Sequence, residues 1–186
     1  MQELDVDAIE ERAEAVLARV PSWLWDGETV PVPVDAIADS MFSLLVRVVE
    51  DMSAAPGCPK LEPGQSISGL LLASRGEIWV NADEARQWPG RRRFTICHEL
   101  GHWVLHRRGQ QSLFCRHGSI EEAERADTRP PLPVTEEEAN VFAAALLMPA
   151  PLIRRHYEET GRDFEALCEL FGASGAAMGR RLHAVL

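Results

Sequence analysis

Two histidines spaced four residues apart, with a glutamate directly after the first, constrain this chain more than any other feature. They form the segment His98-Glu99-Leu100-Gly101-His102, within a stretch from Arg91 to Arg107 that is predicted to be one helix. On a helix both imidazoles leave the same face, about 6 Å apart along the axis, so both can bind one zinc ion. Glu99 then lies beside the ion, where it can take a proton from metal-bound water and pass it to a leaving amine. The sequence therefore predicts a fold built around a metal-binding helix.

A glycine stands inside this motif, at a position where helices disfavour it. Gly101 costs about 1 kcal/mol relative to alanine in a helix interior. A tightly packed neighbour would explain that cost, so we expect another element to lie close to the helix at Gly101.

A second predicted helix, from about Thr135 to Leu147, offers a third metal ligand. Two histidines do not complete a catalytic zinc site, which needs a third protein ligand and an open position. Glu136 is the favoured candidate, because Asn140 follows four residues later on the same face and its amide could orient a ligand histidine. Glu137 and Glu138 stay open as alternatives, although they would face solvent or the helix start, where negative charge is favourable in any case.

Other candidates for the third ligand fit less well. His106 continues the four-residue spacing, but it lies about 12 Å from His98 along a straight helix, too far to share one ion. Cys115, His117 and the glutamates of residues 121–124 stand in polar, irregular sequence. Zinc suits the histidine and carboxylate ligands best, although manganese or iron could occupy the same residues.

The first half of the chain is predicted to supply the strands. A helical period covers residues 5–19, and a short helix begins near Asp35, which we expect to be its N-cap. Much of 41–49 is apolar and β-branched, which indicates a strand. Residues 67–73 and 78–80 flank a short turn and are typical of a hairpin.

Helices are predicted to dominate after residue 90. Residues 110–133 are polar and interrupted, and the helix that follows starts with Thr135 and Glu138 in the spacing of a capping box. Two or three short helices follow to Leu186. We therefore expect an α+β fold, in which a small antiparallel three-stranded sheet packs on the zinc-binding helix and a mostly helical part follows.

Length and composition bound the domain organisation. With 186 residues and 46% hydrophobic residues, the chain fits one domain with a small appendage. We divide it into an N-terminal helical extension, residues 1–30, and a main domain, residues 31–186, whose C-terminal helical segment is 150–186. The extension either caps the fold or contacts a partner, and the first is favoured.

Charge and hydropathy exclude several classes of protein. The net charge of −10 argues against binding along a nucleic-acid backbone, and the basic run Arg91-Arg92-Arg93 is predicted to be a solvated helix start rather than a substrate-docking patch. No apolar stretch is long enough to cross a membrane. The acidic N-terminus is unlike a signal peptide, so we expect a cytoplasmic protein. The four scattered cysteines favour neither disulfides nor a cysteine-based zinc module.

The chain resembles the ImmA/IrrE-type metallopeptidases of bacteria and their mobile elements, over roughly Pro31 to Leu186. The segments that carry the resemblance are 67–70 and 78–81 in the hairpin, 93–106 around the histidine motif, 136–149 in the second helix, and 164–182 near the end. The resemblance implies a gluzincin-like peptidase fold. It also implies that His98, His102 and Glu136 bind zinc and that Glu99 is the general base.

One residue departs from the family pattern. Cys97 stands where the family usually has a small residue such as alanine, and we expect it to be a core substitute for that residue. Its side chain points about 100° round the helix from His98, so direct binding to the metal is disfavoured.

The resemblance further implies proteolysis of a specific partner. Characterised relatives cut helix-turn-helix transcriptional repressors, which are commonly encoded by a neighbouring gene. The expected substrate is such a repressor, or the antitoxin-like partner of a two-gene module. An extended substrate could add to the hairpin strand around Ile78 to Asn81. For an oxyanion donor, Tyr157, His156 and His183 are the candidates, although a packing or surface role is favoured for each.

Two other functions stay open. The chain could be a non-catalytic module that binds a repressor or toxin on a retained peptidase fold. It could also be a DNA-binding regulator, because residues 164–182 have a spacing like that of a helix-turn-helix, although the acidic balance weakens this alternative.

Overall fold

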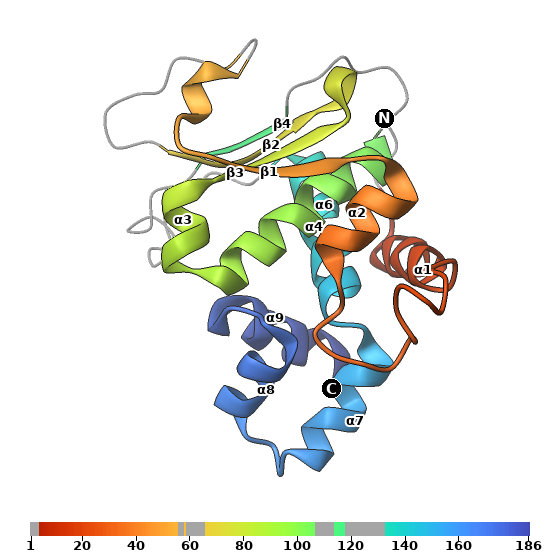
Figure 1. Cartoon of the computed structure of the whole chain (residues 1–186). Coiled ribbons are helices and arrows are strands. Elements are labelled where there is room, and N and C mark those ends of the chain that lie inside the picture. Colours follow the sequence, from red (N-terminus) through yellow and green to blue (C-terminus); the bar gives the residue numbers. More distant parts are fainter. Residues whose placement is uncertain (1–3, 56–57, 59–65, 107–113, 118–132) are drawn as a thin grey trace.

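The computed structural model describes residues 4–55, 58, 66–106, 114–117 and 133–186, the segment 114–117 by its backbone path. The predicted α+β class is confirmed. One mixed sheet forms a layer at one end of the molecule, and helix α4, Pro89–His106, runs beneath it (Figure 1). The last three helices lie at the opposite end from the sheet (Figure 1).

The sheet has four strands in the order β1-β3-β2-β4. The predicted hairpin is confirmed as β2, Ile67–Leu72, and β3, Glu77–Asn81, which pair antiparallel. Strand β1, Leu45–Val49, runs parallel to β3, and β4, Phe114–His117, runs antiparallel to β2. The sheet is therefore larger than predicted, and it is mixed rather than antiparallel. The partner and direction of a strand depend on the path of the chain between strands, and the local alternation of apolar residues does not reveal that path.

The position of β3 corrects one prediction about substrate binding. Its residues Ile78 and Trp79 pair with β1 on one side and with β2 on the other. The backbone of an internal strand is already hydrogen-bonded on both sides, so a peptide cannot add at Ile78 to Asn81. Among the described strands the edges of the sheet are β1 and β4.

Strand β2 is buried on both faces, which explains its continuous apolar sequence. Leu71 packs into the main core with the helices, whereas Leu70 and Leu72 join a smaller cluster with Met52 and Trp79 on the other face. This alternation fixes which residues of β2 face α4.

The predicted helices are confirmed, with boundaries shifted by a few residues. In chain order they are α1, Val6–Leu17; α2, Val34–Phe42; α4; α6, Val134–Leu147; α7, Ala150–Glu159; α8, Phe164–Phe171; and α9, Gly175–Val185. One further helix, α3 at Ala82–Gln87, was not predicted. Its signal is Asn81, whose side chain accepts hydrogen bonds from the N–H groups of Asp83 and Glu84.

Two predicted caps are wrong. Helix α6 begins one residue before Thr135, and the carbonyl of Pro133 accepts the hydrogen bonds from Glu136 and Glu137 that a capping box would place later. Pro33 likewise precedes α2, so Asp35 lies inside the helix rather than at its N-cap. In both cases a proline occupies the position just before the first helical turn and is itself outside the helix.

The basic run at the start of α4 is not a solvated cluster. Arg91 binds Glu84 of α3, Arg92 binds Asp35 of α2, and Arg93 donates a hydrogen bond to the carbonyl of Val32. These partners are distant in sequence, so the run of arginines alone did not reveal them. The three side chains therefore connect the start of α4 to α3, to α2 and to the segment before α2.

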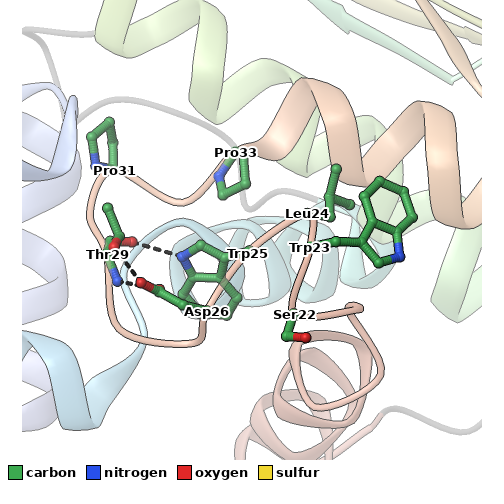
Figure 2. A pocket seen from close by; sticks show the side chains of 8 residues that line it. All are labelled: Ser22, Trp23, Leu24, Trp25, Asp26, Thr29, Pro31 and Pro33. Carbon is green, nitrogen blue, oxygen red and sulfur yellow. Dashed lines mark hydrogen bonds between the residues drawn. The ribbon is translucent and has the colours of Figure 1, made fainter.

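Helix α1 packs on α6 and contributes Ile9, Ala13 and Val16 to the main core. The loop after it is held by Trp25, whose indole N–H donates to the carbonyl of Thr29 at 2.7 Å (Figure 2). A hollow of about 330 Å³ lies in this loop, and Trp23 beside it is 76% exposed. None of the residues lining this hollow belongs to the metal site predicted above.

Candidate metal centre

The centre forms where α4 and α6 lie against each other. A Cβ built on Gly101 would be 3.2 Å from the Cα and from the carbonyl oxygen of Ala139, closer than most side chains tolerate. The predicted tight neighbour of Gly101 is therefore confirmed, and it is α6. Because the two backbones approach so closely, a side chain from α6 can reach the histidine face of α4.

His98, His102 and Glu136 come together at this contact. Nε2 of His98 and Nε2 of His102 are 3.1 Å apart, and each is 3.1 Å from one carboxylate oxygen of Glu136. All three candidate ligand atoms lie within 4.8 Å of one another. Among the described residues the two histidine side chains are almost completely buried, whereas the Glu136 side chain keeps 20% of its exposure.

These distances fit a single metal ion. Two ligands on a tetrahedral ion at about 2.0–2.1 Å are separated by about 3.3 Å, close to the 3.1 Å separations in this group. Two imidazole nitrogens and one carboxylate are a typical ligand set for a divalent transition metal with an open position. The three residues could therefore hold such an ion.

Asn140 supports the centre from behind. Its Oδ1 lies 3.1 Å from Nδ1 of His98. In this arrangement the Nδ1–H of His98 donates to the amide oxygen, which leaves the lone pair of Nε2 directed at the metal position. The structure thus brings Asn140 to the place where the sequence predicted an orienting amide.

The electrostatics of Glu136 favour its ionised form. Burial raises the pKa of this carboxyl, but hydrogen bonds with His102 and His98 outweigh burial, and the pKa stands well below its ordinary value. A carboxylate that stays ionised at neutral pH is the form that binds a cation.

Glu99 lies beneath β2 and is fully buried. Gly69 of β2 faces it: a Cβ built on Gly69 would lie 3.1 Å from Oε1 of Glu99 and 2.2 Å from Cγ2 of Thr95. The absent side chain of Gly69 therefore leaves the space that Glu99 occupies. Nothing in the local sequence connects this glycine with the glutamate, because the contact joins a strand to a helix far along the chain.

The structure places the other predicted candidates elsewhere. His106 lies 3.4 Å from Glu138, and that glutamate also accepts a hydrogen bond from the N–H of Leu4. His156 binds Glu159 within α7, and Tyr157 lies under the guanidinium of Arg162.

Glu137 is not among the described residues that could hold a metal. Glu137 and His183 are exposed on α6 and α9. Cys115 and His117 lie on β4, where only the backbone is described, and residues 121–124 lie outside the described residues.

Cys97 is fully buried in the main core, as predicted. Burial raises the pKa of its thiol to about 12. The side chain is not among the residues that could hold a metal in the described part of the chain.

A buried polar cluster next to Gly69 was also not predicted from the sequence. The Ser68 hydroxyl donates to Glu84 at 2.9 Å, and Arg91 contacts the carboxylate of Glu84 at 2.8 Å and the Ser68 oxygen at 3.0 Å. Ser68 and Glu84 are 2% and 7% exposed. The cluster joins β2, α3 and α4 beside the residue that faces Glu99.

Fold and site together define an α+β protein with a His-Glu-x-x-His helix and a carboxylate from a second helix. Residues 63–183 match the family described as IrrE N-terminal-like domain, and the chain belongs to this family. The predicted resemblance to ImmA/IrrE-type proteins is thereby confirmed.

Two known proteins are similar to the chain. It is 36% identical over 135 residues to the radiation response metalloprotease IrrE of Deinococcus radiodurans, a match that covers 72% of this chain and 38% of IrrE. Its fold is similar to that of a Mycobacterium tuberculosis transcriptional regulator, with a TM-score of 0.53, 17% identity, and coverage of 94% of this chain and 46% of the regulator. The chain thus spans less than half the length of either protein.

Within the described part of the chain, no helix is both long and apolar enough to cross a membrane.

Proposed function

We propose that this chain is a zinc-dependent endopeptidase that acts in the cytoplasm on a specific helix-turn-helix repressor or antitoxin-like partner. The observation that carries the proposal is the convergence of His98, His102 and Glu136, with Glu99 on the same helix as the two histidines. The named relative, a radiation response metalloprotease, supports a peptidase. Manganese or iron are alternative ions for the same three residues.

The chemistry divides between the ion and the protein. When bound, zinc lowers the pKa of a water molecule and polarises the carbonyl of the scissile peptide bond. His98 and His102 would hold the ion through Nε2, and Asn140, which contacts Nδ1 of His98, would keep that ring in the required orientation. The carboxylate of Glu99 accepts the proton of the attacking water and then delivers it to the leaving amine. Its complete burial strengthens its interaction with charges at the centre.

The sheet suggests where an extended peptide lies. Strand β4 is an edge among the described strands and pairs with β2, the strand whose Gly69 faces Glu99. A peptide added to the outer edge of β4 would lie two strands from Gly69, whereas one added to β1 would lie three strands away, so β4 is the edge nearer to Glu99.

The partner is proposed from the family resemblance alone. A small repressor encoded beside this chain is the first candidate substrate, and its cleavage would release transcription. In the test, the zinc-loaded chain is incubated with that repressor, and the mass of the repressor is followed over time. The Glu99→Gln protein is the matched variant.

We expect cleavage by the wild type and a loss of at least about a hundredfold in rate for Glu99→Gln, with repressor binding retained. If both proteins bind the repressor and neither cuts it, the non-catalytic binding module becomes the better account. Equal cleavage by both proteins would contradict the role of Glu99.

A further inference from the structure

His106, the last residue of α4, contacts the first turn of α6 on either side of the candidate ligand Glu136. Its Nε2 lies 3.2 Å from the carbonyl oxygen of Thr135 and 3.4 Å from a carboxylate oxygen of Glu138. A carbonyl oxygen only accepts hydrogen bonds, so Nε2 carries the hydrogen and donates it. One imidazole therefore binds the residue before Glu136 and the residue two positions after it, and we call these two contacts the His106 bridge.

The His106 bridge is buried. The side chains of His106 and Glu138 are 3% and 6% exposed, whereas that of Glu136 is 20% exposed. Water does not compete for contacts at such positions, so they fix the geometry of two helices more firmly than contacts at the surface do. The bridge thus joins the last turn of α4 to the first turn of α6.

Glu138 has a second partner, from the start of the chain. Its Oε1 accepts a hydrogen bond from the N–H of Leu4 at 2.7 Å, while its Oε2 faces His106. Helix α1 begins two residues after Leu4 and packs on α6. Both oxygens of this buried carboxylate are therefore occupied, one by α4 and one by the segment before α1.

The first turn of α6 needs such support because it carries a candidate ligand. The first N–H groups of a helix have no partner within the helix, and helix ends fray. The N-cap residue is Pro133, whose side chain has no oxygen to accept a hydrogen bond from this turn. Glu136 is the third residue of α6, so its place at His98 and His102 depends on how this turn is held.

We infer that His106 and Glu138 are positioning residues, which hold the first turn of α6 so that Glu136 reaches the metal. The Leu4 N–H supports Glu138 in this role, so the N-terminal segment contributes to the metal centre. The inference rests on the proposed function, because it takes His98, His102 and Glu136 as the ligands. His106 itself needs no contact with the ion.

The test is a double-mutant cycle on zinc affinity, measured by competition with a chromophoric chelator. His106→Phe keeps an aromatic ring beside His102, whose ring centroid lies 5.5 Å from that of His106, but removes the donor. It is measured alone and together with Glu136→Ala. The matched control is His156→Phe, because that histidine pairs with Glu159 inside α7.

Two further variants separate the donor from the fold. Leu4→Pro removes the N–H that binds Glu138 and changes no residue of α4 or α6, so it decides the question if His106→Phe does not fold. His106→Gln places an amide N–H near the position of Nε2 and should retain most of the zinc affinity.

We expect His106→Phe to lower zinc affinity at least about tenfold when Glu136 is present. The same substitution should change affinity less than about twofold beside Glu136→Ala, because the ligand that it positions is gone. Leu4→Pro should cost about threefold, again only when Glu136 is present. His156→Phe should bind zinc like wild type.

The outcomes that overturn the inference differ from those that overturn the proposed function. No loss in His106→Phe, or an equal loss with and without Glu136, would mean that His106 does not act through Glu136, and the metal centre would stand. For Leu4→Pro the same criterion applies. Failure of wild type to bind zinc, or undiminished binding by Glu136→Ala, would remove the metal centre and the proposed function with it.

Discussion

Gly101 of α4 lies so close to Ala139 of α6 that a Cβ on the glycine would be 3.2 Å from the alanine backbone. This contact brings Glu136 to the two histidines. A substitution that separates the helices should therefore disturb the candidate metal centre before it disturbs the rest of the fold.

Gly101→Ala tests this coupling. The added methyl group must push α6 away by a few tenths of an ångström, because the nearest atoms belong to its backbone. Overpacking of this kind costs about 1–3 kcal/mol, which outweighs the gain of about 1 kcal/mol in helix propensity. We expect lower stability in urea and zinc affinity reduced about tenfold.

The control for that variant is Gly179→Ala in α9. A Cβ at Gly179 meets nothing within 4 Å, so only the propensity gain applies and the protein should become more stable by about 0.5–1 kcal/mol. Equal effects of the two substitutions would show that the close approach of α4 and α6 does not matter.

Gly69→Ala should displace Glu99, because the added methyl group collides with Thr95 on the same helix. The new methyl group would lie 2.2 Å from Cγ2 of Thr95 and 3.1 Å from Oε1 of Glu99, so β2 or α4 must shift. We expect a loss of about 2 kcal/mol in unfolding free energy. Adding Thr95→Ser removes the nearest atom and should recover part of that loss. A double variant no more stable than the Gly69→Ala protein would contradict the predicted contact.

The cluster of Ser68, Glu84 and Arg91 should matter more than a surface ion pair. Glu84→Ala leaves a partly buried arginine without its carboxylate, and we expect a loss of about 3 kcal/mol in chemical denaturation. Glu50→Ala breaks the exposed pair with Arg86 and should change stability very little. Similar results for the two variants would mean that the buried cluster is not a stabilising element.

Cys97 should resist alkylation in the folded protein. Its thiol is fully buried with a pKa of about 12, so at pH 8 only roughly one molecule in ten thousand would carry the reactive thiolate. Peptide mass spectrometry after iodoacetamide should find Cys97 unmodified in native protein and modified after unfolding in urea. Rapid modification in the native state would place the thiol in solvent.

The helix that carries the candidate metal ligands could be predicted because its evidence is local. The spacing of His98 and His102 fixes their common face on any helix, and the pair Glu136 and Asn140 follows the same rule. The tight contact at Gly101 could also be predicted, since a glycine inside a helix needs an explanation. Which element makes that contact could not, because it depends on the packing of α6.

Features that depend on distant partners escaped prediction. Nothing near β1 shows that it runs parallel to β3, and the arginines at the start of α4 gave no sign of Glu84, Asp35 or the carbonyl of Val32. The capping box at Thr135 failed for a local reason, because Pro133 already supplies the first carbonyl of the helix.

The most direct test of the metal centre is elemental analysis of three proteins: wild type, Glu136→Ala and Glu137→Ala. The two glutamates are neighbours on α6, but only Glu136 reaches the histidines. We expect about one zinc ion per chain in wild type and in Glu137→Ala, and a large loss in Glu136→Ala. Zinc retained in full by Glu136→Ala, or lost equally from both variants, would contradict it.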